Sequence, residues 1–216
     1  MFGLFPHRRW PTLSLEQIRA RARILAIDDE PWTYVEMFAR DGYKVEQWSD
    51  VTDLAALEKG TYDIVFLDIK GVGKQIADDE GLGVLRRLRR ASPIQIIVAF
   101  SNQQFSLEDK PFFDLATAAV DKTNTDYVDY KSLIDDLLEK RFSLNWYVDQ
   151  VIDIVHQQTR DAKKLRKQTE KAILHRSTHS FEKRMNPQTA AEEETVEKSL
   201  LVIRSAISVL ERCHGS

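Results

Sequence analysis

The chain has 216 residues, of which 43% are hydrophobic, and a formal net charge of −3. This length allows one domain of ordinary size with an appendage, and the lack of an apolar run of about 18 residues argues against a membrane-spanning helix. The opening segment MFGLFPHRRW is too short and too interrupted for a secretory signal. A single cysteine, Cys213, excludes an internal disulfide and fits a reducing compartment, so we expect a cytoplasmic protein.

The charged residues are unevenly distributed along the chain. Residues 1–23 carry five arginines and one glutamate, and residues 160–216 carry 12 basic and 8 acidic residues. The segment 24–159 between these basic ends is therefore strongly acidic. An acidic surface repels phosphate backbones, so this middle segment is not expected to bind nucleic acid.

Five short segments in the first two thirds of the chain predict strands, four because they are mainly apolar and residues 43–48 because polar and apolar residues alternate. They are residues 23–27, 43–48, 62–68, 94–101 and 116–122. The fourth is continuously apolar, which indicates a strand buried on both faces. Helical patterns separate the strands, and this alternation predicts a doubly wound parallel sheet within residues 24–141.

The predicted helices of this domain have recognisable start and stop signals. The first, residues 32–40, has Asp29 as a candidate cap and Pro31 in its first turn. The second begins at Asp50 or Thr52 and stops at Gly60. A third covers residues 79–92, whereas residues 102–115 are expected to form a loop or a short helix interrupted by a proline.

The tail is predicted to be helical. Neither glycine nor proline occurs from Asp126 to Asn186, and apolar residues recur at helical spacing, so the last helix of the domain is expected to run without a break towards Val155. A turn at residues 186–187 begins another helix. That helix carries a heptad seam too short to hold a coiled coil alone; its members are Val196, Leu200, Ile203, Ile207 and Leu210. We expect a helical hairpin that packs on itself or on a second copy.

Polar residues stand at the carboxyl ends of four predicted strands: Asp28 and Asp29, Asp68, Ser101, and Lys122. A single strand that ends in aspartate has the ordinary explanation of turn chemistry. In a parallel sheet, however, these ends share one edge, so all five side chains would converge there. Three clustered carboxylates need a cation, and their oxygen ligands suit Mg²⁺. A carboxylate beside that metal can attack a phosphoryl donor. The metal, the lysine ammonium group and the serine hydroxyl would then stabilise the negative charge that develops on the phosphoryl oxygens.

Four segments in this order, ILAIDDEP, IVFLD, IIVAFS and VDK, resemble the receiver domain of two-component response regulators. The resemblance implies a flavodoxin-like fold with strand order 2-1-3-4-5. It implies that Asp68 is the phospho-acceptor, that Asp28, Asp29, Asp68 and the backbone carbonyl of Lys70 bind Mg²⁺, and that Ser101 and Lys122 contact the phosphoryl group. The donor would be a histidine kinase or a phosphotransfer protein, and the domain would catalyse only its own phosphorylation and dephosphorylation.

Three features depart from the family pattern. The loop IKGVGKQIADDEG after Asp68 is longer than usual and lacks proline, Thr123 replaces the proline that usually follows the lysine, and Ala119 replaces an aromatic residue. Because the usual aromatic relay is missing, we expect the signal to leave through the last helix of the domain.

These observations predict a response regulator in three parts: a basic arm (1–23) that docks on the acidic domain rather than on a membrane, a receiver (24–141), and a helical output or association region (142–216) that forms a homodimer. Two alternatives remain open. One is a receiver-like interaction module that phosphorylation does not regulate. The other is a nucleic-acid-binding regulator that uses the basic residues between Arg160 and Arg184, although that stretch is expected to be a solvated or partner-facing surface.

Overall fold

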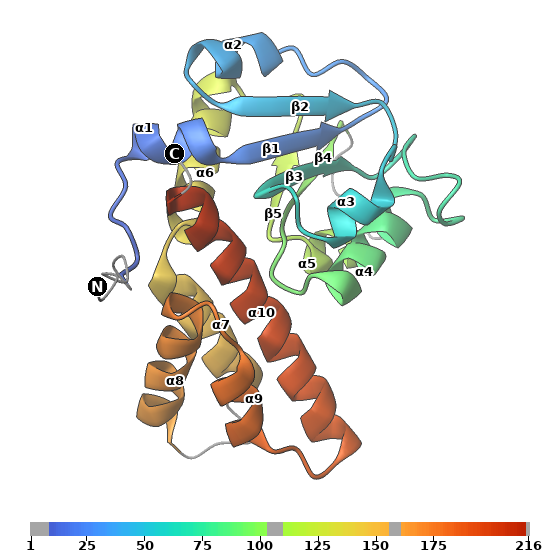
Figure 1. The fold of residues 1–216 in the computed structure, drawn as a ribbon. Coiled ribbons are helices and arrows are strands. Elements are labelled where there is room, and N and C mark those ends of the chain that lie inside the picture. The colour runs from blue at the N-terminus through green and yellow to red at the C-terminus, as the bar shows by residue number, and fades with distance from the viewer. Residues whose placement is uncertain (1–8, 103–109, 156–160, 215–216) are drawn as a thin grey trace. The chain divides into compact units, whose positions relative to one another are not determined.

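The computed structural model describes residues 9–102, 110–155 and 161–214 (Figure 1). The chain forms two compact units, one of Ser14–Arg141 and one of Phe142–Ser216 together with Met1–Leu13. The predicted basic arm is therefore divided, because helix α1 (Leu15–Arg21) packs on helix α6 (Tyr127–Arg141) of the first unit, whereas residues 9–13 belong to the second. The arm's residues Phe2, Leu4 and Phe5 lie outside the described residues.

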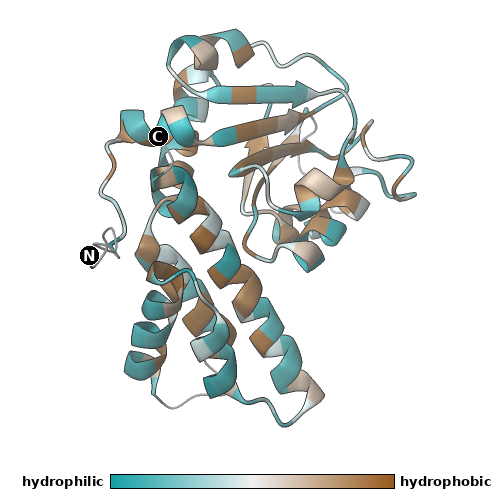
Figure 2. Ribbon diagram, viewed as in Figure 1, coloured by the Kyte–Doolittle hydropathy of each residue, from teal (hydrophilic) through white to brown (hydrophobic). Residues whose placement is uncertain are grey.

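The first unit is built on a five-stranded sheet in which every paired strand is parallel, in the order β2-β1-β3-β4-β5. The strands are β1 (Arg23–Ile27), β2 (Lys44–Trp48), β3 (Ile64–Asp68), β4 (Ile96–Ser101) and β5 (Ala118–Asp121). Strands β3 and β4 are buried at every position. Figure 2 shows β1 and β3 largely brown and the edge strand β2 largely teal. The predicted flavodoxin-like order is confirmed.

Helices cover both faces of this sheet. They are α1, α2 (Val35–Arg40), α3 (Leu54–Glu58), α4 (Gly81–Ala91), α5 (Lys110–Leu115) and α6 (Tyr127–Arg141). On one face, apolar residues of β1, β3 and β4 pack with Leu57 of α3, Leu85 of α4 and Phe112 of α5. The other face holds an aromatic cluster in which the ring centroid of Trp32 lies 5.0 Å from Phe66 and 5.3 Å from Tyr130 of α6.

Two helices of the sheet domain begin after the start signals that the sequence suggested for them. The first, α2, begins at Val35, because the preceding backbone bonds to side chains instead: Glu30 N–H donates to Asp28 Oδ1 and Trp32 N–H to Gln47 Oε1, each at 3.0 Å. The second, α3, begins after Asp53, whose Oδ1 accepts from the Ala56 amide at 2.9 Å. Neither start signal assigned from the sequence to these helices was the correct one.

The prediction of one unbroken helix from the domain into the tail is wrong. Helix α6 ends at Arg141, and α7 (Leu144–Val155) begins three residues later. The Phe142 carbonyl between them accepts a hydrogen bond from Trp10 Nε1 at 2.7 Å, and Ser143 is a residue type favoured at helix N-caps. A helix can therefore end here without glycine or proline.

The tail is helical as predicted, but its described residues contain four helices rather than a hairpin of two. After α7 come α8 (Ala162–Leu174), α9 (His179–Met185) and α10 (Ala190–His214). Helix α9 ends at Asn186 in a left-handed conformation with φ of 36°, which asparagine tolerates better than most residues. Helix α10 packs on α7, α8 and α9.

The predicted association seam of α10 lies largely inside this helical unit. Val196, Ile203 and Leu210 are buried, whereas Leu200 and Ile207 are half-buried. The buried face of the helix consists of Val196, Ser199, Val202, Ile203, Ala206, Val209, Leu210 and Cys213. The prediction that the five seam residues form one face between two copies is therefore wrong for three of them, because they pack against the neighbouring helices of the same chain.

Candidate functional site

The carboxyl edge of the sheet brings the predicted acidic residues together. Asp28 and Asp29 follow β1, and Asp68 is the last residue of β3. One carboxylate oxygen from each lies within 4.8 Å of the others. Asp28 and Asp68 are only 3% and 8% exposed, whereas Asp29 is exposed. Two of the three charges are thus held away from water, where mutual repulsion is poorly screened.

Lys122 supplies the counter-charge for these buried carboxylates. Its Nζ lies 2.6 Å from Asp28 Oδ2 and 2.8 Å from Asp68 Oδ2, and 4.5 Å from the centroid of the Phe100 ring. The Lys122 amide donates to the carbonyl oxygen of Ser101 at 2.9 Å, which extends the pairing of β4 with β5 to the lysine. The sequence reasoning missed the contribution of Phe100, which no spacing rule would have indicated.

Burial and the neighbouring charges act in opposite directions on the pKa of Asp68. Burial raises the pKa of Asp68 above its ordinary value, and the charge of Asp28 raises it further, whereas the hydrogen bond and the charge of Lys122 lower it. The Ile69 amide also donates to Asp68 Oδ1 at 2.7 Å. One lysine therefore offsets only part of the cost of ionising this carboxyl, and a further cation beside it would lower its pKa.

The remaining predicted site residues surround this cluster. Ser101, 4% exposed, ends β4, where its Cα pairs with that of Asp121. Lys70 lies two residues beyond Asp68, and its side chain is exposed. Gly71 has a φ of 82°, and a Cβ added there would overlap the carboxylate of Asp29. The peptide between Lys70 and Gly71 therefore lies against the acidic cluster, although the lysine side chain does not join it.

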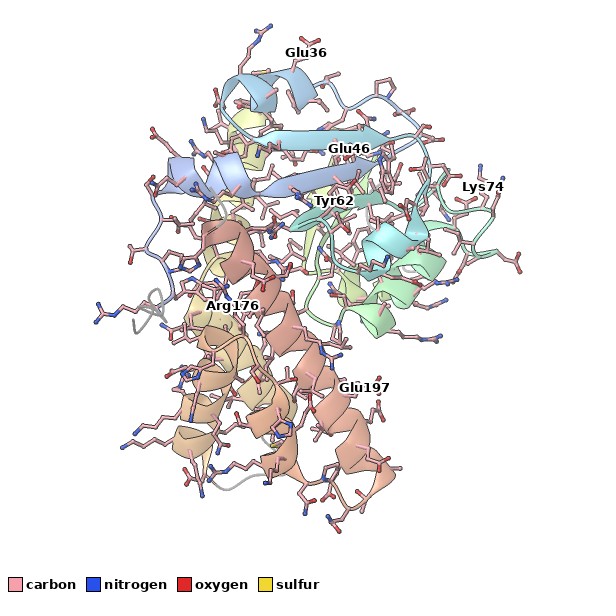
Figure 3. All side chains as sticks on the ribbon, viewed as in Figure 1. Glu36, Glu46, Tyr62, Lys74, Arg176 and Glu197 are labelled. Carbon is pink, nitrogen blue, oxygen red and sulfur yellow. The ribbon has the colours of Figure 1, made fainter. Side chains whose placement is uncertain are left out.

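The long loop after Asp68 is held by hydrogen bonds to two carboxylates. The sequence did not indicate either of them as part of the site. Glu80 Oε2 accepts a hydrogen bond from the Gly71 amide at 2.8 Å, and Asp50 Oδ1 accepts one from the Gly73 amide at 2.5 Å. Lys74, next along this loop, is exposed and points away from the sheet (Figure 3). No spacing rule connects Glu80 or Asp50 with these glycines, so the sequence contained no signal for either bond.

The turn after β5 is held by a side chain in place of the proline that the family resemblance leads one to expect. The Asp121 carboxylate accepts hydrogen bonds from the Thr123 amide at 2.9 Å and from Asn124 Nδ2 at 2.6 Å. The side-chain hydrogen bonds of Thr123 and Asn124 lower the pKa of Asp121. These bonds fix the backbone that follows Lys122 and so help to hold the lysine at the site.

The donor set suits a hard divalent cation. Three carboxylates supply oxygen ligands from one side and leave further positions for water and a backbone carbonyl, which is the arrangement that Mg²⁺ favours. The incomplete neutralisation of Asp68 by Lys122 fits the same conclusion.

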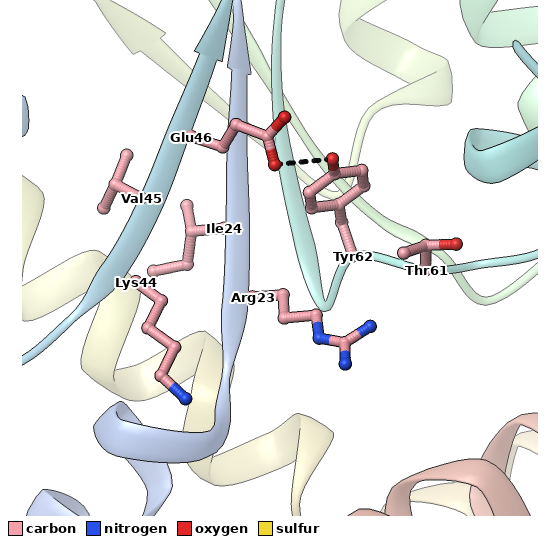
Figure 4. A pocket seen from close by; sticks show the side chains of 7 residues that line it. All are labelled: Arg23, Ile24, Lys44, Val45, Glu46, Thr61 and Tyr62. Carbon is pink, nitrogen blue, oxygen red and sulfur yellow. Dashed lines mark hydrogen bonds between the residues drawn. The ribbon is translucent and has the colours of Figure 1, made fainter. Parts of the chain in front are cut away.

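A cavity of about 350 Å³ lies at the opposite edge of the sheet (Figure 4). Its carboxylate, Glu46, already accepts hydrogen bonds from Tyr62 Oη at 2.8 Å and from Trp48 Nε1 at 2.6 Å. In Figure 4 the ribbon of β1 runs between the two cationic side chains, Lys44 and Arg23. The cavity therefore lacks the convergent groups of the carboxyl edge.

Within the described ranges, none of the helices has the length and apolarity needed to cross a membrane. No model of a protein family matches the sequence, and no curated protein matches it.

Several solved structures of response regulator proteins resemble part of the chain. The chemotaxis response regulator CheY4 of Vibrio cholerae is 17% identical, covers 54% of this chain and 98% of its own, and gives a TM-score of 0.44. A CheY-like response regulator receiver domain protein from Methanospirillum hungatei is 24% identical, with coverages of 55% and 94% and a TM-score of 0.45. A two-component response regulator of the LuxR family from Aurantimonas sp. is 24% identical, with coverages of 55% and 85% and a TM-score of 0.41. These likenesses concern the fold alone.

Proposed function

We propose that the chain is a two-component response regulator whose first unit accepts a phosphoryl group on Asp68. The observation that carries this proposal is the set of three carboxylates within 4.8 Å at the carboxyl edge of the sheet, with Lys122 in contact with two of them. The donor is the phosphohistidine of a histidine kinase or a phosphotransfer protein. Catalysis is limited to the domain's own phosphorylation and dephosphorylation.

Mg²⁺ held by Asp28, Asp29, Asp68 and the Lys70 carbonyl would neutralise charge on the carboxylates and on the phosphoryl oxygens. A carboxylate oxygen of Asp68 forms a bond to phosphorus while the phosphorus–nitrogen bond of the phosphohistidine breaks. The electron pair of that bond stays on the imidazole nitrogen, and the ring leaves as neutral imidazole because its other nitrogen carries a proton.

Lys122 and Ser101 then bind the transferred phosphoryl group. It brings about 1.5 to 2 negative charges into a buried site, so the ammonium group of Lys122, now shared by Asp28 and Asp68, turns to a phosphoryl oxygen. The Ser101 hydroxyl donates a hydrogen bond to another. Both groups also act while the charge develops during transfer.

Incubation with a small phosphodonor and Mg²⁺ tests the proposal. One acid-labile phosphoryl group should appear on Asp68 by intact-protein mass spectrometry, and Asp68→Asn should abolish it. Lys122→Ala should keep measurable uptake but lose the conformational response, followed by the near-ultraviolet circular dichroism of the aromatic cluster. Label that persists at full level in Asp68→Asn contradicts the assignment, and a wild-type chain that takes up no phosphate favours a receiver-like module without phosphate regulation.

The helical unit is the proposed output region, through self-association or partner binding. Since α6 and α7 are separate helices, the signal has to cross residues 142 and 143 rather than pass along one rigid rod. Homodimerisation stays a prediction, and the part of the α10 stripe that is available for it is the half-buried pair Leu200 and Ile207.

One observation favours a second candidate function, binding of nucleic acid by the helical unit. Lys163, Lys167 and Lys171 of α8 are all exposed, and their spacing of four residues sets them on one face, about 6 Å apart along the axis. Among the residues with described positions, no carboxylate pairs with these three lysines. Phosphates are suitable partners for such a row.

Fluorescence anisotropy with a labelled DNA duplex at several salt concentrations tests this second candidate. Replacing the three lysines by alanine should lower the slope of log affinity against log salt by about 0.9 for each phosphate that the variant no longer neutralises. Lys198→Ala is the matched control, because Lys198 Nζ already pairs with Glu194 at 2.6 Å. Equal slopes for the triple variant and the control would remove the case for nucleic acid.

A further inference from the structure

Glu80 bonds to the peptide group that would offer a carbonyl to the metal. Its Oε2 accepts from the Gly71 amide at 2.8 Å, and that N–H belongs to the same peptide unit as the Lys70 carbonyl. Peptide units are planar and trans, so their N–H and C=O groups point in opposite directions. The described residues contain no cis peptide bond. Fixing the direction of the Gly71 N–H therefore fixes the direction of the Lys70 carbonyl.

Other groups hold the backbone on either side of this peptide. The Gly81 amide donates to the Ile69 carbonyl, one peptide unit earlier, at 3.2 Å. Gly71 lies so close to Asp29 that an added Cβ would overlap the carboxylate, so one side of the peptide faces the acidic cluster. The next fastening point along the loop is the bond from the Gly73 amide to Asp50, which is two residues further on. Glu80 is thus the side chain that holds the Lys70–Gly71 peptide itself.

The backbone of Glu80 also indicates that its side chain is needed. Glu80 has φ of 53° and ψ of −127°, a region that glycine adopts freely and other residues seldom adopt. It occupies the N-cap position of α4, yet its side chain makes no capping bond to that helix. A residue in this conformation that does not cap its own helix is better explained by its bond to Gly71 than by local helix stability.

We propose that Glu80 is a positioning residue for the metal site: it orients the Lys70–Gly71 peptide so that the Lys70 carbonyl faces the cation bound by Asp28, Asp29 and Asp68. The inference rests on the proposed function, because it assumes that this edge of the sheet binds Mg²⁺. Hydrogen bonds behind the ligands of a metal set their direction and commonly change metal affinity by about 10- to 100-fold. Glu80 acts here through a backbone ligand rather than a side chain.

Calorimetric titration of the full-length protein with Mg²⁺ tests this role. Glu80→Ala removes the acceptor and should weaken Mg²⁺ binding by about 10-fold or more. Glu80→Gln keeps an acceptor oxygen at the same reach and should stay within a few-fold of wild type. Asp78→Ala is the matched control for charge, because Asp78 is an exposed carboxylate of the same loop with no hydrogen bond to a glycine amide among the described residues.

Glu80→Gly separates positioning from a merely structural role. Glycine relieves the unfavourable backbone conformation, so this variant should unfold at the same temperature as wild type or higher, while its Mg²⁺ affinity falls as in Glu80→Ala. The amide resonance of Gly71 gives a direct readout in nuclear magnetic resonance spectra: Mg²⁺ should shift it in wild type and in Glu80→Gln, and shift it less in Glu80→Ala.

The outcomes distinguish this inference from the proposed function. If wild type itself binds no Mg²⁺, or if Asp68→Asn binds it equally well, the proposed function fails. If wild type binds Mg²⁺ at Asp68 but Glu80→Ala and Glu80→Gly bind it equally well, only the positioning role is refuted. If Asp78→Ala loses as much affinity as Glu80→Ala, the effect is one of loop charge, and the positioning role is again refuted.

Discussion

The guanidinium group of Arg141 lies 3.3 Å from Asp63 Oδ1, and both side chains are buried. Asp63 directly precedes β3, whose other end carries Asp68, and Arg141 is the last residue of α6. The Asp63 carboxylate also accepts from the Arg23 amide at 3.0 Å. This ion pair therefore ties the strand of the candidate acceptor to the point where the chain leaves the first unit.

Replacing Arg141 by Met should destabilise the first unit strongly. The substitution removes the counter-ion of a buried carboxylate, and breaking such a pair commonly costs about 3–5 kcal/mol. The free energy of unfolding from urea titration measures the loss. As a control, Asp79→Asn breaks the more exposed pair of Asp79 with Arg86 and should cost no more than about 1 kcal/mol. Equal effects of the two substitutions would mean that the buried pair has no special role.

Ionisation of Asp68 should make the metal-free protein less stable as pH rises. Burial raises the pKa of Asp68 above its ordinary value of 3.8, so the folded state binds the proton more tightly than the unfolded state. The stability that protonation provides is complete below pH 3.8 and is lost as pH rises through the higher pKa of the folded state. Asp68→Asn cannot ionise, so at pH 7 with a chelator it should be more stable than wild type.

The difference in unfolding free energy between Asp68→Asn and wild type should shrink as pH falls towards 3.8, because wild-type Asp68 then regains its proton. Mg²⁺ should also reduce it, since a ligand at about 100 times its dissociation constant stabilises wild type by about 2.7 kcal/mol. Denaturant titrations at several pH values, with and without Mg²⁺, measure both effects. If the difference in unfolding free energy between the two proteins stayed constant with pH, this would argue against an unfavourable charge on Asp68.

The sheet could be predicted from the sequence because the residues of each strand form a recognisable local pattern. The apolar runs at Ile64–Asp68 and Ile96–Ser101 are buried at every position, and burial on both faces is what a continuous apolar run requires. The helix starts were less predictable, because several residues of one segment can each cap a helix. Asp50 and Asp53 both fit the start of α3, and the choice depends on the Gly73 amide, which bonds to Asp50 from a distant loop.

The candidate site was predictable to the extent that strand ends define it. Asp28, Asp68 and Lys122 converge because parallel strands share one edge, and the observed ion pairs follow from that. Glu80 was not predictable, since its bond to Gly71 depends on the path of a loop with no periodic pattern. The break after Arg141 was missed for a similar reason: a buried ion pair and a bound carbonyl end α6, and neither is visible in the local sequence.

Gly71→Ala should impair the site more than its backbone conformation alone explains. Gly71 has φ of 82° and Gly42 has φ of 86°, so alanine is strained equally at both positions. A Cβ at Gly71, however, would overlap the Asp29 carboxylate, whereas no atom of the described residues lies within 4 Å of a Cβ at Gly42.

Titrations of both alanine variants with Mg²⁺ separate these effects. Gly42→Ala should lose about 1 kcal/mol or more of stability and keep its metal affinity. Gly71→Ala should lose affinity by about 10-fold or more, at least the effect of disturbing the groups that orient a metal's ligands. Unchanged affinity in Gly71→Ala would mean that Asp29 does not take part in binding.

Two isoleucines of α10, four residues apart, should differ strongly in how much stability a charge costs. Ile203 is fully buried among the helices of its unit, so Ile203→Asp would place a carboxylate without a counter-ion in an apolar environment, which costs several kcal/mol. Ile207 is only half-buried, and Ile207→Asp can leave its carboxylate in water. Helical circular dichroism during thermal unfolding should show a large loss of stability for the first variant and a small one for the second.

Light scattering on Ile207→Asp then addresses association. If Leu200 and Ile207 form the contact between two copies, full-length wild type should be dimeric and Ile207→Asp monomeric, with the helix content of both unchanged. Glu211→Ala is the matched control, because it changes an exposed residue one turn further along the same helix and should leave the dimer intact. A wild-type chain that is monomeric with and without a phosphate mimic assigns the whole stripe to packing within one chain, and the output of the helical unit would then have to be a different partner.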